Sequence, residues 1–295
     1  MAEQTRARYP DHAGHIERAG VRLYYELYGS RGPAVFLLPT WSIIHSRQWK
    51  MQIPYLARHF RVLTFDGRGN GRSDRPPTGY QEREFAADAL AVMDATAIDH
   101  ATLVSLSLGS RWALLMAAEH PERVDAAAFI CPAVPLGKPP RGQRRYRWNE
   151  KLETDEGWAK YNRHYWLRDQ RGFLEFFFAK IFTEAHSTKQ IEDCVGWGLE
   201  MAPETLIATE LDEELDEKAV RELCRSIRCP VMVIQGTDDA VTGPDRGISL
   251  AAATQGEVVM FEGSGHCPHV RSPVKVNLLL REFISRNAQP EVRSG

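Results

Sequence analysis

The sequence predicts an α/β protein in which helices cover both faces of a mostly parallel β-sheet. Short apolar runs alternate along the chain with helical patterns of about 10–15 residues, which is typical of strand–helix–strand units. The chain of 295 residues is 43% hydrophobic, so it can bury a sizeable core. A chain of this length forms one large domain with an insertion, or two small domains.

The first half of the chain supplies most of the expected sheet. Residues 21–28 are rich in β-forming side chains and end at the turn cluster Gly29–Pro33. Together with a strand near 15–18 they predict a hairpin. The apolar run 34–38 predicts a buried strand that ends at Pro39. Further strands are expected at 61–65, from 101 onward and at 124–130, with helices near 48–59, 82–97 and 111–120.

The pattern changes after Cys131. Residues 132–228 lack a clear strand and are rich in aromatic side chains, several of which recur at helical spacing on one face. We therefore predict a helical cap at 132–228 inserted between two parts of a core, 1–131 and 229–295. We expect most of its rings to form the core of the cap. The sheet pattern returns with strands at 230–235 and 257–261 and helices near 244–253 and 273–286.

Charge and cysteine content exclude several classes of protein. The net charge is −2, from 37 basic and 39 acidic residues, which argues against a nucleic-acid-binding or membrane-surface protein. No apolar run is long enough for a membrane span, and the N-terminus shows no secretory signal. Five scattered cysteines without a Cys-x-x-Cys pair indicate no zinc site and favour a reduced compartment. We expect a soluble, cytoplasmic protein.

One serine lies in a context that suits a nucleophile. The sequence Ser105-Leu-Ser107-Leu-Gly109 follows an apolar strand and opens an Ala/Leu-rich helix. A sharp turn between strand and helix exposes a serine at its tip and requires small residues two positions to either side. The similar pattern around Ser249 lies within a predicted helix with no strand before it, so we interpret Ser249 as an ordinary helical residue.

Possible partners for Ser107 follow the last two strands. Asp238 and Asp239 come directly after Gly236-Thr237, and His266 lies in the loop after residues 257–261. Side chains just past the carboxyl ends of parallel strands meet at one edge of a sheet. A serine hydroxyl needs a base to accept its proton, and a carboxylate orients a histidine for that role. The chain order serine, acid, histidine is the order expected for this turn.

In these segments and in Phe65-Asp-Gly-Arg-Gly-Asn-Gly-Arg-Ser-Asp74, the chain resembles the α/β-hydrolase superfamily, specifically its capped, esterase-like branch. The resemblance covers residues 20–131 and 229–287. It implies an eight-stranded sheet and a catalytic triad of Ser107, Asp239 and His266, with Asp238 as the alternative acid.

The resemblance also implies an oxyanion hole made by the backbone N–H groups of Trp41 and Leu108. The family usually has His-Gly where this chain has Pro39-Thr40, which leaves open whether the hydroxyl of Thr40 or Ser42 assists. Arg271 stands where the family often has an acid, and the sequence assigns it no role. We expect packing or surface roles for His45 and His269.

We therefore expect a serine hydrolase that cleaves a small to medium, partly apolar carboxylic ester without a metal or cofactor. The same triad serves carbon–carbon bond hydrolases, lactonases, acyltransferases and perhydrolases, so these reactions stay open. A sensor that binds a ligand and turns over slowly is a further alternative. Haloalkane dehalogenases and epoxide hydrolases are disfavoured, because they use an aspartate nucleophile. The natural substrate and the oligomeric state are not specified by the sequence.

Overall fold

A computed structural model of the chain describes residues 6–138, 147–210 and 215–288. An eight-stranded sheet runs through the centre in the order β1-β2-β4-β3-β5-β6-β7-β8. The pairs β1–β2 and β2–β4 are antiparallel and all others are parallel, which confirms the predicted fold class. The strands are β1 (His12–Arg18), β2 (Val21–Tyr28), β3 (Ala34–Leu37), β4 (Arg61–Phe65), β5 (Ala101–Leu106), β6 (Val124–Ile130), β7 (Val231–Gly236) and β8 (Glu257–Phe261).

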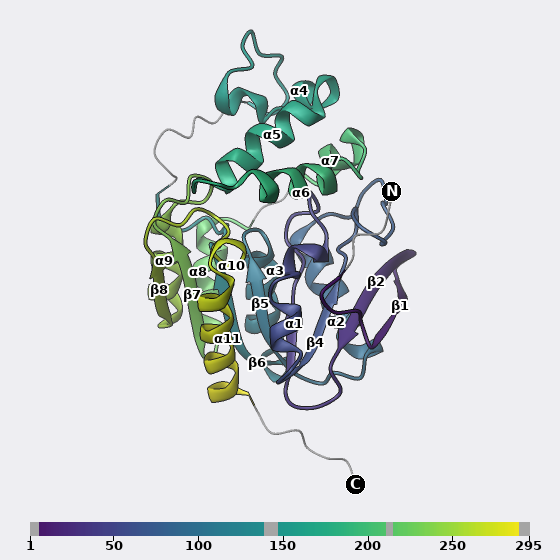
Figure 1. Cartoon of the computed structure of the whole chain (residues 1–295), viewed down its shortest axis with the longest axis vertical. Coiled ribbons are helices and arrows are strands. Elements are labelled where there is room, and N and C mark those ends of the chain that lie inside the picture. The colour runs from purple at the N-terminus through teal and green to yellow at the C-terminus, as the bar shows by residue number, and fades with distance from the viewer. Residues whose placement is uncertain (1–5, 139–146, 211–214, 289–295) are drawn as a thin grey trace.

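Helices cover both faces of the sheet (Figure 1). One face carries α2 (Glu82–Ala95), α3 (Gly109–Glu119), α8 (Glu217–Ser226) and α9 (Pro244–Thr254), and the other carries α1 (Ile53–Leu56) and α11 (Pro273–Asn287). The central strands are buried on both sides, so they consist of apolar runs rather than alternating patterns. The sheet thereby separates two apolar clusters, one under each helical layer.

A further group of helices lies over the carboxyl edge of the sheet (Figure 1). It consists of η3 (Gly157–Lys160), α4 (Arg163–Arg168), α5 (Gln170–Ile181), α6 (Thr188–Gly198) and α7 (Pro203–Ala208). We call residues 157–210 the upper layer. Its centre is aromatic: the rings of Trp166 and Phe173 are fully buried and stack with their centroids 4.3 Å apart. Helix α8 belongs to the 132–228 segment in sequence but packs on α3 and α9.

The largest departure from the predicted elements lies between β3 and β4. The prediction of a continuous helix over 48–59 is wrong. The segment forms a short 3₁₀ turn, η1 (Ser46–Trp49), and then the four-residue α1. Pro54 explains the break. Proline has no N–H to donate and its ring clashes with the carbonyl of the residue four positions earlier, so it is tolerated only in the first turn of α1.

All five cysteines carry free thiols, and four of them are buried. Among the described residues, no helix combines the length and the apolar character needed to span a bilayer.

Candidate active site

Ser107 forms the turn between β5 and α3. Its φ is +52°, a left-handed conformation that is uncommon outside glycine. Such a conformation costs free energy and persists only where the surrounding structure enforces it. Its backbone N–H donates to the carbonyl of Ile130 at 3.0 Å, and its carbonyl accepts from Ser110 and Ala133, both at 3.0 Å. These bonds hold the predicted nucleophile in the conformation that a sharp strand-to-helix turn requires.

Gly109 permits close contact between this turn and the loop after β3. A Cβ at position 109 would lie 2.6 Å from the carbonyl oxygen of Pro39, a distance that side chains do not tolerate. The same carbonyl accepts a hydrogen bond of 2.9 Å from the indole of Trp112 in α3. The start of α3 is therefore packed directly on the loop that carries Trp41.

The two predicted oxyanion donors lie on the two sides of this contact. Leu108 precedes Gly109, and Trp41 follows Pro39-Thr40. Within the described part of the chain, neither the backbone N–H of Leu108 nor that of Trp41 donates to another protein group. The proton of the Ser42 hydroxyl is not available to an oxyanion, because it is donated to the carbonyl of Arg68 at 2.8 Å. The buried Thr40 hydroxyl has no partner among the described residues.

Asp239 and His266 form a buried pair at the carboxyl edge. The distance from Nδ1 of His266 to Oδ2 of Asp239 is 2.9 Å, and the residues are 1% and 3% exposed. The other donors to the carboxylate are the backbone N–H groups of Val241 and Thr242, the Thr242 hydroxyl at 2.6 Å and the Gln235 amide at 3.2 Å. Gln235 and Thr242 belong to no motif that would have marked them in the sequence.

These contacts determine the charge of the carboxyl group. Burial alone raises the pKa of Asp239, but the adjacent His266 imidazole and the bonds from Thr242 outweigh it and hold the pKa well below its ordinary value. Asp239 is therefore ionised at neutral pH. Asp238 is exposed, and its carboxylate accepts from the Thr237 hydroxyl at 3.1 Å rather than from His266.

The other ring nitrogen of His266, Nε2, is buried and has no hydrogen-bond partner in the described part of the chain. No hydrogen bond joins it to Ser107 in this structure, in which both side chains are described. Hydrogen bonds between a serine and its base are often long without substrate and shorten when substrate binds. Nε2 is thus the free position at which His266 can accept a proton.

Cys131 is a third buried group beside this pair. It directly follows β6, and its sulfur lies within 4.8 Å of ligand atoms of Asp239 and His266. A thiol, an imidazole and a carboxylate form a donor set for a metal, but the Asp239 carboxylate here already accepts five hydrogen bonds. Burial and the neighbouring Asp239 raise the pKa of the Cys131 thiol, which therefore stays protonated.

Several upper-layer residues hold the loop that carries His266. The backbone N–H of His266 donates to the carbonyl of Ile181 at 3.0 Å. The Glu184 carboxylate accepts from the backbone N–H of Gly265 at 2.9 Å and from the Ser264 hydroxyl at 3.0 Å. These residues lie about 80 positions before His266 and form no local motif with it, so the contact could not be predicted from local sequence.

Arg271, to which the sequence assigned no role, has one in this arrangement. It lies at the end of α10 (Pro268–Arg271) and donates to the carbonyls of Ala185 at 2.8 Å and His186 at 3.3 Å. Both carbonyls belong to the segment between α5 and α6. Arg271 therefore joins α10, the helix that follows His266, to the upper layer by two hydrogen bonds.

The remaining residues singled out from the sequence lie elsewhere. Ser249 is in the middle of α9, as predicted. His45 and His269 are buried, which agrees with a packing role: His45 contacts the ring of Trp197, and His269 contacts that of Trp49.

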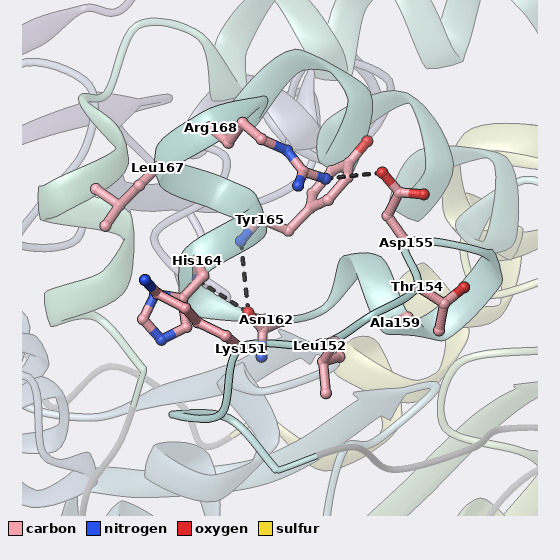
Figure 2. A pocket seen from close by; sticks show the side chains of 10 residues that line it. All are labelled: Lys151, Leu152, Thr154, Asp155, Ala159, Asn162, His164, Tyr165, Leu167 and Arg168. Atoms are coloured by element: carbon pink, nitrogen blue, oxygen red, sulfur yellow. Dashed lines mark hydrogen bonds and ion pairs between the residues drawn. The ribbon is translucent and has the colours of Figure 1, made fainter.

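A surface cleft of about 450 Å³ lies between residues 151–155 and the part of the upper layer around α4 (Figure 2). The Asn162 side chain caps the start of α4 by accepting from the backbone N–H of His164 at 2.9 Å, and Arg168 pairs with Asp155 at 2.7 Å. The cleft is lined by Lys151, Leu152, Thr154, Asp155, Ala159, Asn162, His164, Tyr165, Leu167 and Arg168. None of the predicted catalytic residues is among them.

The profile of the family described as "alpha/beta hydrolase fold" matches residues 33–273. An AB hydrolase superfamily protein of Bacillus subtilis, YisY, is 28% identical over 275 residues, which cover 89% of this chain and 95% of that protein. The 3-oxoadipate enol-lactonase 2 of Acinetobacter baylyi is 23% identical over 269 residues, covering 90% and 94%.

A solved structure extends the likeness to the fold. Est816, described as an N-acyl homoserine lactone degrading enzyme, superposes with a TM-score of 0.76 at 26% sequence identity. The superposition covers 92% of this chain and all of the other.

Proposed function

This chain belongs to the α/β-hydrolase family, and from that premise we propose that it is a serine hydrolase that cleaves carboxylic esters. The proposal depends mainly on one observation. A buried, ionised Asp239 accepts from Nδ1 of His266 and leaves Nε2 without a partner, which is how a histidine is prepared to act as a general base.

The sheet topology supports Ser107 as the nucleophile. Strands β5 and β7 are separated only by β6, so their carboxyl ends are about 10 Å apart, given a spacing of about 4.8 Å between neighbouring strands. Ser107 follows the first of these ends and Asp239 follows the second. The Cys131 sulfur, just after the intervening β6, lies within 4.8 Å of ligand atoms of both Asp239 and His266, so the pair reaches the strand next to β5.

In the proposed reaction the hydroxyl oxygen of Ser107 attacks the ester carbonyl carbon while its proton passes to Nε2 of His266. The tetrahedral intermediate then expels the alcohol, which takes that proton and leaves an acyl-enzyme. Water attacks the acyl-enzyme with His266 again as base, and the acid product and free serine result. Asp239 holds the tautomer in which Nε2 is the acceptor and stabilises the imidazolium that forms.

The negative oxygen of the intermediate needs hydrogen-bond donors. We assign this role to the backbone N–H groups of Trp41 and Leu108, which flank the contact between Gly109 and Pro39. Each such donor contributes about 2.7–4 kcal/mol of transition-state stabilisation. The unpartnered Thr40 hydroxyl is the side chain of this loop that is available to assist.

Lactones are the second candidate substrates. A lactone is a cyclic ester that the same steps open, and two of the similar proteins carry names for lactone chemistry, enol-lactonase and N-acyl homoserine lactone degradation. The deciding experiment is a rate measurement on p-nitrophenyl esters of increasing chain length and on γ-butyrolactone and acyl homoserine lactones, for wild type and S107A. Faster turnover of linear esters supports an esterase, and faster turnover of the lactones supports a lactonase.

A slowly turning ligand-binding protein is the non-enzymatic alternative. A single turnover followed by retention of the product, with no steady-state rate on any ester or lactone, would favour it. Turnover by S107A at the wild-type rate would exclude the proposed nucleophile.

A further inference from the structure

The side chain of Trp41 extends from the loop after β3 into the upper layer. Its indole N–H donates to the hydroxyl of Thr209 at 2.9 Å, and the residue is only 9% exposed. Its ring meets that of Phe177 edge-on at 89°, with the centroids 5.5 Å apart. Three more rings of the upper layer lie within 6.4 Å of it: Tyr161, Trp166 and Phe173. The upper layer thus fixes both the position and the rotation of this indole.

Thr209 is itself held in place. It follows α7, is 2% exposed, and its hydroxyl donates to the carbonyl of Leu206 at 2.7 Å. Because the single hydroxyl proton is used in that bond, the lone pairs of the oxygen are left to accept from Trp41. The hydrogen bond between Trp41 and Thr209 therefore has one direction and a defined geometry.

The loop around Trp41 is fastened to the core at its two ends. The Pro39 carbonyl accepts from the Trp112 indole at 2.9 Å, and the Ser42 hydroxyl donates to the carbonyl of Arg68 at 2.8 Å. Between these two points, the side chain of Trp41 is held by a hydrogen bond to Thr209, which lies in the upper layer. Within the loop, the Trp41 carbonyl accepts from the backbone N–H of Ile44 at 3.3 Å. The other polar contact of Trp41 is the bond from its indole to Thr209, 168 residues later, so the orientation of the peptide that carries the Trp41 N–H depends on both contacts.

We propose that Thr209 is a positioning residue for the oxyanion hole: through the indole of Trp41 it sets the direction of the Trp41 backbone N–H. This rests on the proposed function, because the N–H matters only if it stabilises an oxyanion. Oxyanion-hole donors act only when they are already aimed at the developing charge. The upper layer then contributes to the rate of the chemical step as well as covering the sheet edge.

The test compares T209V with T209S. Valine keeps the branched shape and removes the acceptor oxygen, whereas serine keeps the oxygen. With a p-nitrophenyl ester that wild type hydrolyses, we expect T209V to lower kcat about tenfold with KM changed less than about twofold, and T209S to stay within about twofold of wild type. Inhibition by phenylboronic acid, which forms a tetrahedral adduct on a serine, should weaken by about the same factor as kcat falls.

Three further variants separate positioning from general stability. W158F is the matched control, because Trp158 lies in the same aromatic cluster and contacts Tyr161 and Phe176 rather than Trp41; it should keep the wild-type kcat. W41F removes the indole N–H, and the double variant W41F/T209V should be no slower than W41F alone, because both changes break the same bond.

The outcomes distinguish the two proposals. An active wild type with an unchanged kcat in T209V, or additive effects of W41F and T209V, would overturn the positioning role and leave the hydrolase intact. If wild type neither hydrolyses any ester or lactone nor reacts with a fluorophosphonate, the proposed function fails, and the role of Thr209 fails with it.

Discussion

The backbone N–H of His266 donates to the carbonyl oxygen of Ile181, the last residue of α5, at 3.0 Å. The contact is close: a Cβ on the neighbouring Gly265 would lie 2.9 Å from the same carbonyl and 2.6 Å from the Thr183 hydroxyl. The upper layer is thus hydrogen-bonded to the backbone of the proposed base. Ile181 and Glu184 should therefore influence catalysis through the loop that carries His266.

Glu184 offers the clearest test of that connection. E184A removes the acceptor of the Gly265 N–H and the Ser264 hydroxyl, so the loop before His266 loses one backbone and one side-chain hydrogen bond. We expect kcat to fall about tenfold, since displacement of a catalytic group by about 1 Å is enough for a larger loss. E184Q keeps an acceptor oxygen and should retain more than a third of the activity. Equal kcat values for wild type and E184A would contradict this role.

Asp239 should be essential, while its neighbour should not be. In D239N the side chain no longer carries the charge that holds the His266 tautomer, and we expect kcat to fall about 10⁴-fold. D238N is the matched control: Asp238 is exposed and bonded to Thr237, so its kcat should stay within about twofold of wild type. Steady-state kcat values of wild type, D239N and D238N on one ester measure both effects. A larger loss in D238N than in D239N would assign the acid to the other aspartate.

Gly109 should matter for stability and for the geometry of the loop. In G109A the new methyl group meets the Pro39 carbonyl at 2.6 Å, and a shift of backbone against backbone costs about 1–3 kcal/mol. Gly196, in α6, has open space around its Cα, so G196A should be neutral or stabilising by up to about 1 kcal/mol. Urea unfolding measures both. If G109A were as stable as wild type, the close approach of α3 to the loop would be disproved.

His269 should make stability depend on pH. Burial, with a smaller contribution from the nearby His266, lowers the pKa of His269 to about 3. The unfolded chain, with an ordinary pKa near 6.5, therefore binds a proton that the folded chain excludes. Its contribution to stability is complete above pH 6.5 and is lost as the pH falls toward 3, by up to about 1.4 kcal/mol per pH unit.

Urea midpoints between pH 7.5 and 4.5 measure this dependence. H269F should flatten the curve, because phenylalanine can stack on Trp49 and does not titrate. A wild-type slope that persists in H269F would assign the titration to another group.

Local sequence was sufficient to predict the elements that build the sheet. The strands at 21–28, 61–65, 124–130 and 257–261 have the predicted limits, because buried strands are short apolar runs bounded by turns. The turn at Ser107 and the proximity of the Asp239 loop to the His266 loop could also be predicted from the sequence. Each of these segments follows the carboxyl end of a strand, and the carboxyl ends of parallel strands lie at the same edge of the sheet.

Contacts between segments that are far apart in the chain could not be predicted from a single sequence. Glu184 and Thr209 lie in a segment whose helices follow no sheet pattern, and their partners, Ser264 and Trp41, are 80 and 168 residues away. Pro54 shows a different failure, since the apolar spacing around it favoured a helix that its missing N–H prevents. Periodicity reports which face is buried, whereas hydrogen bonds between elements depend on how those elements pack.

The most direct test of the hydrolase is covalent labelling by a fluorophosphonate, followed by intact-protein mass and peptide mapping. Wild type should gain one adduct on Ser107, S107A should gain none, and S249A should label like wild type, because Ser249 occupies a similar sequence pattern inside α9. Equal labelling of S107A and wild type, or no labelling of a folded wild type, would contradict the assignment of Ser107 as the nucleophile.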